Sequence, residues 1–431
     1  MELKEVKGLK FVDGGVCAAK GFRANGIQCG LAHKPLADTD KNSAESNNAL
    51  PSAKKKNDLA LIVADKECTA AAVYTTNKVK GAPILVTKEH LKNGKAKAVI
   101  VNSVNANTCN PDGVEKAHKM CALAAAELGI NADDVIVAST GVIGQILPIE
   151  PIANGMKELA EGLSYDGNPH AVEAIMTTDT MPKELAVQFE LGGKTCTMGG
   201  MLKGSGMIHP NMATTLTFIT TDADISAELL QRALSDVVKV TLNRVSVDGD
   251  TSTNDMVCVL AAGTAGNKPV VHEDEDFEKF ETALYGVMMN LARLMARDGE
   301  GATKLIECVC SGADTEKTAE IVAKSVITSS LFKAAMFGED ANWGRILCAV
   351  GYADADFDIN MVDVSIGSVK GSIDVCKNGA GLEFSEEKAK EILEEEEILI
   401  SISIGNGSGS AVAWGCDLTY DYVKINGDYR S

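Results

Sequence analysis

The sequence has few aromatic residues and no long apolar run. Phe, Trp and Tyr make up 4% of the 431 residues, whereas hydrophobic residues as a whole make up 45%. The core must therefore consist mainly of Ala, Val, Ile, Leu and Met, which is common in layered α/β proteins. No uninterrupted apolar stretch reaches the length of a membrane-spanning helix, so we expect no membrane span.

Positive charge is also in short supply. Lys and Arg number 41 against 60 Asp and Glu, which gives a formal net charge of −19. Phosphate backbones and anionic membrane surfaces repel so acidic a protein. We therefore expect neither a nucleic-acid partner nor a membrane partner.

Paired cysteines are missing as well. The twelve cysteines are scattered singly, apart from Cys308 and Cys310, and no CxxC pair occurs. This pattern is typical of reduced, buried thiols in the cytosol and not of a disulfide framework or a zinc site. The first residues are charged and lack the apolar segment of a signal peptide. We expect a soluble, cytoplasmic protein of two or three domains that holds no metal.

Common enzyme signatures are absent too. No HExxH, Walker A or GxSxG motif occurs, and the six histidines are widely dispersed. Residues 248–255 look like a calcium loop, but Leu260 stands near the position where an EF-hand needs glutamate. Residues 405–409 are glycine-rich but lie between two predicted strands, so they lack the helix that a pyrophosphate site requires.

What the sequence does contain is an abrupt change of pattern within residues 203–220. The first half has two glycines and a proline, which predicts a loop. From Thr214 onward, side chains alternate with the period of a strand rich in β-branched residues. On spacing alone, an ordinary loop that leads into a strand is the favoured interpretation.

The letters of this stretch, KGSGMIHPNMATTL, closely resemble the self-cleavage segment of the ornithine acetyltransferase family, the bifunctional glutamate N-acetyltransferases of arginine biosynthesis. Further family-like segments follow the same order along the chain: STG at 139–141, TTDT at 177–180, DGDTSTND at 248–255, DGEGATK at 298–304 and YVKINGDYR at 422–430. The resemblance covers residues 21–431 and therefore nearly the whole chain.

The resemblance implies both a fold and a way of processing. The implied fold is α/β, a layered α-β-β-α sandwich of the self-processing type with a smaller, strand-rich C-terminal domain at about residues 306–431. The implied cut follows Ala213 and gives an α chain of residues 1–213 and a β chain of residues 214–431. The two pieces are expected to stay associated, as an α2β2 assembly.

The chemistry explains why a hydroxyl residue must follow the cut. Once the Ala213–Thr214 bond is broken, Thr214 carries its own α-amine, which can accept the hydroxyl proton during nucleophilic attack. The ordinary pKa of an α-amine is about 7.7–8.0, so a part of it is neutral at cellular pH. Ser or Thr could serve as this nucleophile, whereas Ala or Val could not.

The resemblance also implies the other site residues. The Thr140 hydroxyl and the Gly141 amide are implied as an oxyanion hole, where spacing alone favours a plain strand-end turn. The implied substrate contacts are Thr177, Lys203, Thr214, Glu300, Asn426 and Ser431. Thr178 is the neighbouring alternative to Thr177, and Glu300 is implied to bind the cationic amine of ornithine. Lys203 could hold a substrate carboxylate, help to polarise the nucleophile, or be a solvated surface charge.

The implied activity is a ping-pong transfer of the acetyl group from N-acetylornithine to Thr214 and then to glutamate, without a cofactor. The sequence leaves open whether acetyl-CoA is also a donor, because residues 23–28 miss the final Gly or Ala of the common acetyltransferase loop. Two other functions fit the same residues. One is an N-terminal-nucleophile aminopeptidase or amidase on a similar scaffold, and the other is an uncleaved regulatory protein that binds amino acids.

The remaining patterns predict individual elements. Helices are expected at about 113–128, 226–240, 274–297 and 318–332, and a hairpin is expected over 185–198. Strands are expected at 59–63, 70–75 and 418–425. The polar, low-complexity residues 35–57 are predicted to form a mobile surface loop.

Overall fold

The computed structural model describes residues 2–31, 56–209 and 215–427. Ala213, Thr214 and Ser431 lie outside the described residues, as does nearly all of the predicted surface loop at 35–57.

A nine-stranded mixed sheet forms the larger part of the molecule. Its order is β1-β6-β7-β8-β10-β3-β4-β5, and β2 pairs with β3. The strands are β1 (Lys10–Val12), β2 (Phe22–Ile27), β3 (Leu59–Tyr74), β4 (Lys95–Asn102), β5 (Val135–Ser139), β6 (Lys183–Leu191), β7 (Lys194–Lys203), β8 (Leu216–Thr221) and β10 (Met256–Ala261). β8 and β10 are parallel neighbours with Met256 opposite Leu216, so the residues that precede these two strands meet at one edge of the sheet.

Strand β3 corrects one prediction. Residues 59–63 and 70–75 were expected to be separate strands, but β3 is one element of 16 residues. Its pairing with β4 is interrupted between Val63 and Cys68, and three exposed charged residues fill the interruption. A charged bulge therefore has the sequence pattern of a loop, although the strand continues through it.

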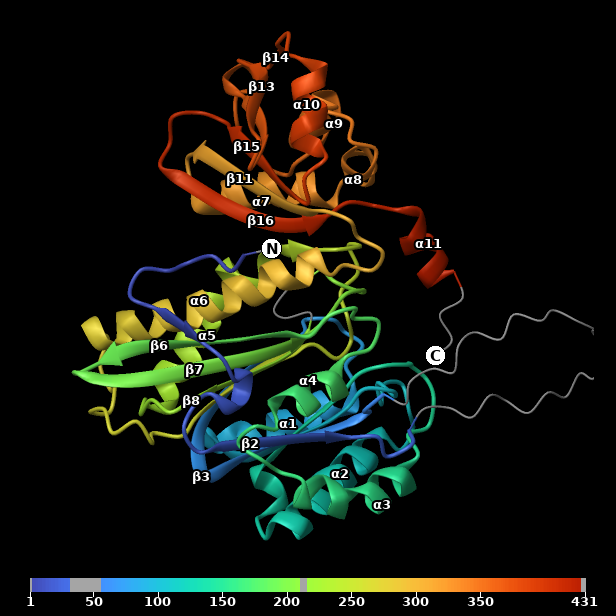
Figure 1. Cartoon of the computed structure of the whole chain (residues 1–431), viewed down its shortest axis with the longest axis vertical. Coiled ribbons are helices and arrows are strands. Elements are labelled where there is room, and N and C mark those ends of the chain that lie inside the picture. Colours follow the sequence, from blue (N-terminus) through green and yellow to red (C-terminus); the bar gives the residue numbers. More distant parts are fainter. Residues whose placement is uncertain (1, 32–55, 210–214, 428–431) are drawn as a thin grey trace, which may run out of the picture.

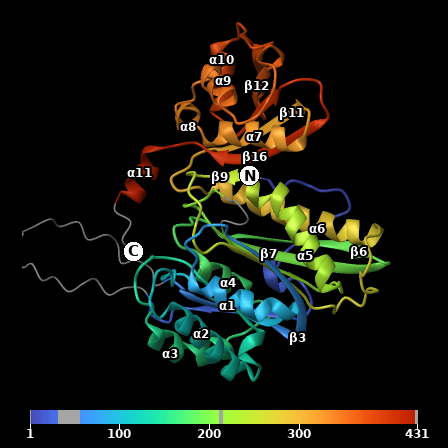
Figure 2. The same cartoon turned by 180° about the vertical axis from the view of Figure 1, so that it is seen from behind.

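Helices cover the sheet in layers (Figures 1 and 2). α5 (Ala227–Val240) and α6 (Glu275–Arg297) share one hydrophobic core with β6, β7 and β8. α2 (Gly113–Leu128) and α3 (Ile149–Glu161) share another with β3, β4 and β5, and α1 (Ala82–His90) borders it. A third core contains residues of α4 (Asn168–Ile175), of strands β2 to β5, and of strands β7, β8 and β10. It fills the space between these two groups of strands. The expected α-β-β-α layering is confirmed.

A smaller, seven-stranded sheet follows in the order β14-β13-β12-β15-β11-β16-β9. Its strands are β9 (Val245–Ser246), β11 (Leu305–Ala313), β12 (Asp363–Ser368), β13 (Gly371–Lys377), β14 (Ala380–Gly381), β15 (Glu397–Ser403) and β16 (Gly409–Cys416). α7 (Glu316–Thr328), α8 (Ser330–Phe337), α9 (Trp343–Gly351) and α10 (Glu386–Leu393) share its core. This strand-rich unit stands beyond α6 in Figure 1.

Three of the helices predicted from the sequence are confirmed, and side-chain caps mark the start of two of them. The helix over 113–128 is α2, and Ser226 and Asp274 cap α5 and α6 as their positions suggested. The single helix expected over 318–332 is wrong, because Ser329 ends α7 and caps α8. The strand expected over 418–425 is also wrong, because Thr419 caps a helix there, α11 (Tyr420–Asn426), by accepting a hydrogen bond from the Tyr422 amide.

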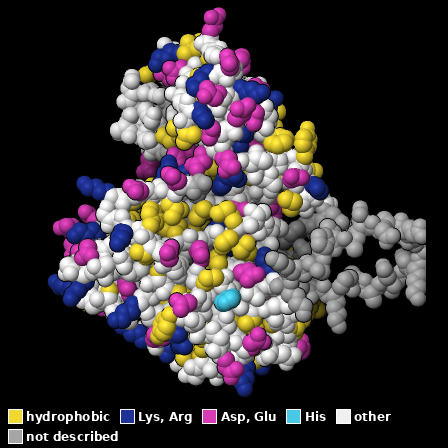
Figure 3. Space-filling model, viewed as in Figure 1, with side chains coloured by type: hydrophobic (Ala, Val, Ile, Leu, Met, Phe, Trp, Pro, Cys, Tyr) yellow, Lys and Arg dark blue, Asp and Glu magenta, His cyan; other side chains and the backbone are white. Residues whose placement is uncertain are grey.

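The visible surface carries the mixture of acidic and basic side chains that the composition suggests. On the face in Figure 3, Lys and Arg are interspersed with Asp and Glu, and no broad basic patch of the kind that binds nucleic acid gathers there. None of the described helices is both long and apolar enough to cross a bilayer. The twelve cysteines all lie in the described part of the chain, and each is a free thiol.

Candidate active site

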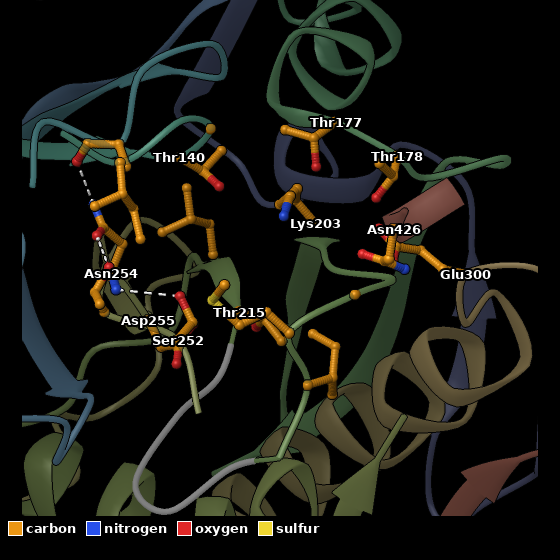
Figure 4. A pocket seen from close by; sticks show the side chains of 18 residues that line it. Thr140, Thr177, Thr178, Lys203, Thr215, Ser252, Asn254, Asp255, Glu300 and Asn426 are labelled. Carbon is orange, nitrogen blue, oxygen red and sulfur yellow. Dashed lines mark hydrogen bonds between the residues drawn. The ribbon is translucent and has the colours of Figure 1, made fainter. Parts of the chain in front are cut away.

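A cavity of about 120 Å³ opens at the edge of the large sheet, and we call it the central pocket (Figure 4). Its walls come from the loop after β4, the loop after β5, the segment after α4, the end of β7 and the loop that follows it, the start of β8, the loop before β10, the loop after α6 and the end of α11. The fold thus gathers distant parts of the sequence around one space.

The central pocket brings together six of the residues singled out in the sequence: Thr140, Gly141, Thr177, Lys203, Glu300 and Asn426. Thr178, the alternative to Thr177, lines it as well. Thr214 and Ser431 lie outside the described residues, but Thr215 lines the pocket and precedes β8. The nearby His209 is not among the lining residues.

Gly141 occupies a place that only glycine fits. Its φ is +121°, and an added Cβ would lie 2.1 Å from the carbonyl oxygen of Val104. The flanking amides are used, since Thr140 N donates to Asn102 O at 3.0 Å and Val142 N donates to Val104 O at 3.0 Å. The Gly141 amide has no hydrogen-bond partner among the described residues, so it is available to a ligand.

Side-chain amides hold this strand end in place. Asn254 Nδ2 donates to Ala106 O at 2.6 Å and to Ser139 O at 2.9 Å. Asn102 Nδ2 donates to Ser139 Oγ at 2.7 Å, and Asn102 Oδ1 accepts from Asn105 N at 3.0 Å. Asn102 at the end of β4 and Asn254 in the loop before β10 therefore hold Ser139, the residue that precedes Thr140 and Gly141.

Glu300 lies on the side of the pocket opposite this strand end, and hydrogen bonds and close contacts fix its position. The carboxylate is only 7% exposed, and it accepts a hydrogen bond from Asn426 Nδ2 at 2.7 Å. The Glu300 amide donates to Ser205 O at 2.9 Å, and a Cβ on Gly206 would lie 2.3 Å from the Glu300 carboxyl. α11 thus contributes to the pocket through Asn426.

A buried ionic group, which we call the Lys183 cluster, lies behind this side and consists of Lys183, Asp179 and Asp298. Lys183 Nζ is 2.7 Å from Asp179 Oδ1 and also pairs with Asp298, and the three side chains are 0%, 0% and 3% exposed. Asp179 accepts hydrogen bonds from the amides of Thr177 and Gly204, each at 2.8 Å. The cluster therefore joins three segments of the pocket wall.

The charge state of the cluster follows from its contacts. Burial alone would raise the pKa of Asp179, but the ammonium groups of Lys183 and Lys203 and the hydrogen bonds hold that pKa well below its usual range. Asp179 is therefore a carboxylate at any physiological pH. Lys183 and Asp179 were not assigned a role from the sequence, because a lysine at the start of a strand gives no signal of its burial.

The loop at 246–251 anchors the chain just before the undescribed residues 210–214. Asp248 accepts hydrogen bonds from Met207 N at 2.6 Å and Ile208 N at 2.9 Å. Thr251 Oγ1 donates to His209 O at 2.7 Å, and the His209 ring contacts Ser246 Oγ at 3.1 Å. Burial and the nearby Lys324 lower the pKa of His209, so its ring is neutral near pH 7.

A pocket that combines hydroxyl groups, a free amide, an ammonium and a carboxylate at the edge of a layered α/β sheet is that of an enzyme for a small, charged substrate. The chain belongs to the ArgJ family, whose profile matches residues 45–431. The family resemblance seen in the sequence is thereby confirmed.

Relatives that match nearly the whole chain agree with this membership. The arginine biosynthesis bifunctional protein ArgJ 1 of Clostridium acetobutylicum is 49% identical over 377 residues, which cover 87% of this chain and 92% of that protein. The ArgJ of Caldanaerobacter subterraneus is 46% identical over 424 residues and covers 98% of this chain and 100% of its own length. A crystal structure of ArgJ from Bacillus halodurans is 47% identical with a TM-score of 0.47, covering 49% of this chain and 97% of that chain. Ornithine acetyltransferase from Mycobacterium tuberculosis, complexed with ornithine, is 33% identical with a TM-score of 0.40, covering 48% and 100%.

Proposed function

We propose that this chain is an acetyltransferase of arginine biosynthesis that moves the acetyl group of N-acetylornithine to glutamate through an ester on Thr214. The observation that supports it most is the convergence of Thr140, Gly141, Lys203 and Glu300 on one pocket beside Thr215. The full-length similarity to proteins named for arginine biosynthesis supports the substrate class.

The proposed chemistry uses residues on one side of the pocket. The Thr214 hydroxyl attacks the acetyl carbonyl, and the α-amine of Thr214 accepts the hydroxyl proton. The Thr140 hydroxyl and the unpaired Gly141 amide donate hydrogen bonds to the oxygen that becomes negative. The amide C–N bond then breaks, ornithine leaves, and the acetyl group remains on Thr214 as an ester.

The other side of the pocket binds the amino acid. In this proposal the Glu300 carboxylate, held by Asn426, pairs with the side-chain ammonium of N-acetylornithine. The Lys203 ammonium pairs with a substrate carboxylate, and Thr177 and Ser431 complete the contacts. Glutamate then enters the same space, and its amine attacks the ester.

Several further properties belong to the same proposal. Cleavage after Ala213 generates the amine of Thr214, and the pieces of residues 1–213 and 214–431 remain together as α2β2. The proposed transfer needs neither a cofactor nor acetyl-CoA, and an assay with acetyl-CoA and glutamate tests whether acetyl-CoA is a second acetyl donor. A cytoplasmic location agrees with twelve free cysteines.

The proposal is tested by incubating the purified protein with N-acetylornithine and glutamate and measuring N-acetylglutamate, ornithine and acetate. Equal amounts of N-acetylglutamate and ornithine are expected. Free acetate without N-acetylglutamate would instead indicate a hydrolase of the aminopeptidase or amidase type. Intact-mass analysis of the same sample should give two polypeptides, one of which begins at residue 214, and a single full-length species would favour a regulatory binding protein.

A further inference from the structure

Asp255 is a buried carboxyl in the central pocket whose position is not explained by the roles assigned above. The residue is 3% exposed and lines the pocket, where Figure 4 places it with Ser252 on the side opposite Glu300. Its Oδ2 atom has no hydrogen-bond partner among the described residues. Buried polar atoms are nearly always paired, so an unpaired carboxyl oxygen in a pocket is a sign of use by a ligand.

The position of Asp255 is fixed by the sheet. It directly precedes β10, and the next residue, Met256, donates its amide to Thr215 O at 2.8 Å. Because β8 and β10 are parallel with Met256 opposite Leu216, Asp255 stands beside Thr215. It is therefore next to the residue that follows the proposed nucleophile in the sequence.

The surroundings of Asp255 favour its uncharged form. Burial raises the pKa of Asp255 well above its usual range, and the Ser252 hydrogen bond and the Lys203 ammonium oppose this only in part. The charged groups that face the pocket are Lys203 from β7 and Glu300 from the loop after α6. These surroundings favour the form of Asp255 that holds a proton.

We propose that Asp255 donates the proton that the departing amine needs when the acetyl group leaves N-acetylornithine, and that it later takes a proton from the amine of glutamate. This inference rests on the proposed function and names a proton donor in the same site. An amine is a poor leaving group without a proton, so an acid beside the reacting carbonyl has a defined task.

The protons balance over the cycle. In the first half the amide C–N bond breaks and the ester C–O bond forms, while the hydroxyl proton passes to the α-amine of the nucleophile and Asp255 gives its proton to the nitrogen. In the second half the Asp255 carboxylate takes one proton from the glutamate ammonium, and the α-ammonium returns its proton to the hydroxyl oxygen. Ornithine takes one proton from water as it leaves, and the nitrogen of the new amide releases one proton to water.

The leaving group provides the test. p-Nitrophenyl acetate serves as a second acetyl donor in this test, because its leaving nitrophenolate needs no proton. In the Asp255→Asn variant we expect ornithine release from N-acetylornithine to fall by about 10²–10⁴-fold. Nitrophenolate release should change by less than about threefold, because no acid acts in that step. Asp250→Asn is the matched control, since Asp250 is an exposed residue of the same loop that does not line the pocket.

Wild-type protein offers a second test that needs no variant. The rate of ornithine release should fall as the pH rises through the pKa of Asp255, because the acid loses its proton. The rate of nitrophenolate release should lack this fall. Intact mass first establishes that the Asp255→Asn protein is cleaved; where it is not, the two wild-type pH profiles decide.

The outcomes separate this inference from the proposed function. Equal losses with both donors in Asp255→Asn, or coinciding wild-type pH profiles, would overturn the role of Asp255 and leave the transfer reaction intact. Failure of the wild-type protein to form N-acetylglutamate would overturn the proposed function itself.

Discussion

The two sides of the central pocket differ in how their polar atoms are paired. On the binding side, Glu300 accepts a hydrogen bond from Asn426 at 2.7 Å, and the neighbouring Thr178 Oγ1 lies 2.7 Å from Ser205 Oγ. On the reactive side, formed by Gly141 and Asp255, an amide and a carboxyl oxygen have no partner among the described residues. Figure 4 shows Asp255 and Glu300 on opposite sides of the pocket.

This difference indicates different tasks. Paired groups are rigid, so they suit the recognition of a substrate that must enter and leave. Unpaired buried donors and acids are costly in the empty protein, and they gain their partners only when a substrate reacts. Changes on the reactive side should therefore lower kcat, and changes on the binding side should raise KM.

The largest effect should come from changing the proposed nucleophile, Thr214. The Thr214→Ala variant should remain one chain and lose acetyl transfer by at least about 10⁴-fold, because it has neither the hydroxyl nor the freed amine. Intact mass and N-acetylglutamate formation measure this. Thr214→Ser is the control, which should be cleaved and keep activity; turnover by the alanine variant would contradict the mechanism.

The second-largest effect should come from Lys183, whose buried ion pairs support the binding side of the pocket. Lys183→Met leaves the buried carboxylates of Asp179 and Asp298 without their cation and should lower the free energy of unfolding by about 3–5 kcal/mol. Lys194→Met changes an exposed lysine at the start of β7 and should stay within about 0.5 kcal/mol. Urea unfolding followed by circular dichroism gives both values, and equal stabilities would show that the Lys183 cluster does not hold the wall.

The Gly141 amide tests the reactive side. In Gly141→Ala the new Cβ would meet Val104 O at 2.1 Å, so the backbone must shift and the free amide must turn away from the pocket. We expect kcat to fall by about 10²–10³-fold, the usual cost of losing one oxyanion donor. Gly144→Ala is the control, because its φ is also positive, at +80°, but an added Cβ meets nothing within 4 Å. Equal losses in the two variants would point to loop strain instead of a lost donor.

The binding side should respond differently. Glu300→Gln removes a charge but keeps the shape, so KM for N-acetylornithine should rise by about 10–100-fold, which corresponds to one hydrogen bond to a charged group. The value of kcat should change much less. Steady-state kinetics with both substrates separate the two constants, and Glu278→Gln on the exposed surface of α6 is the control. A fall in kcat with an unchanged KM would remove the distinction between the two sides.

The sequence predicted much of this arrangement, and the errors in individual strands and helices have a common cause. Helix α2 and the hairpin of β6 and β7 follow from local periodicity, and Gly141 and Glu300 lie within family-like motifs. The continuity of β3 through its bulge and the helix α11 were missed, because a bulge and a single capping threonine outweigh local pattern.

The Lys183 cluster and the unpaired state of Asp255 could not be predicted for a different reason. Lys183 and Asp298 are 115 residues apart, and nothing in either neighbourhood shows that they meet. Asp255 stands in the family-like segment 248–255, for which no catalytic role was predicted. Whether its carboxyl has a partner depends on every segment around the pocket, so that property belongs to the fold and not to the motif.

The smallest effect concerns pH and the Asp179 carboxylate. Because its ion pairs and hydrogen bonds hold its pKa well below the unfolded value of about 3.9, the ionised form stabilises the fold at pH values above that number. This stabilisation should be lost progressively as the pH falls below about 4, since the unfolded chain takes up the proton first. The difference in unfolding free energy between wild type and Asp179→Asn should therefore be constant from about pH 5 to 7 and shrink below pH 4. A difference that does not change with pH would mean that Asp179 acts on the binding side only through its shape and its hydrogen bonds to Thr177 and Gly204.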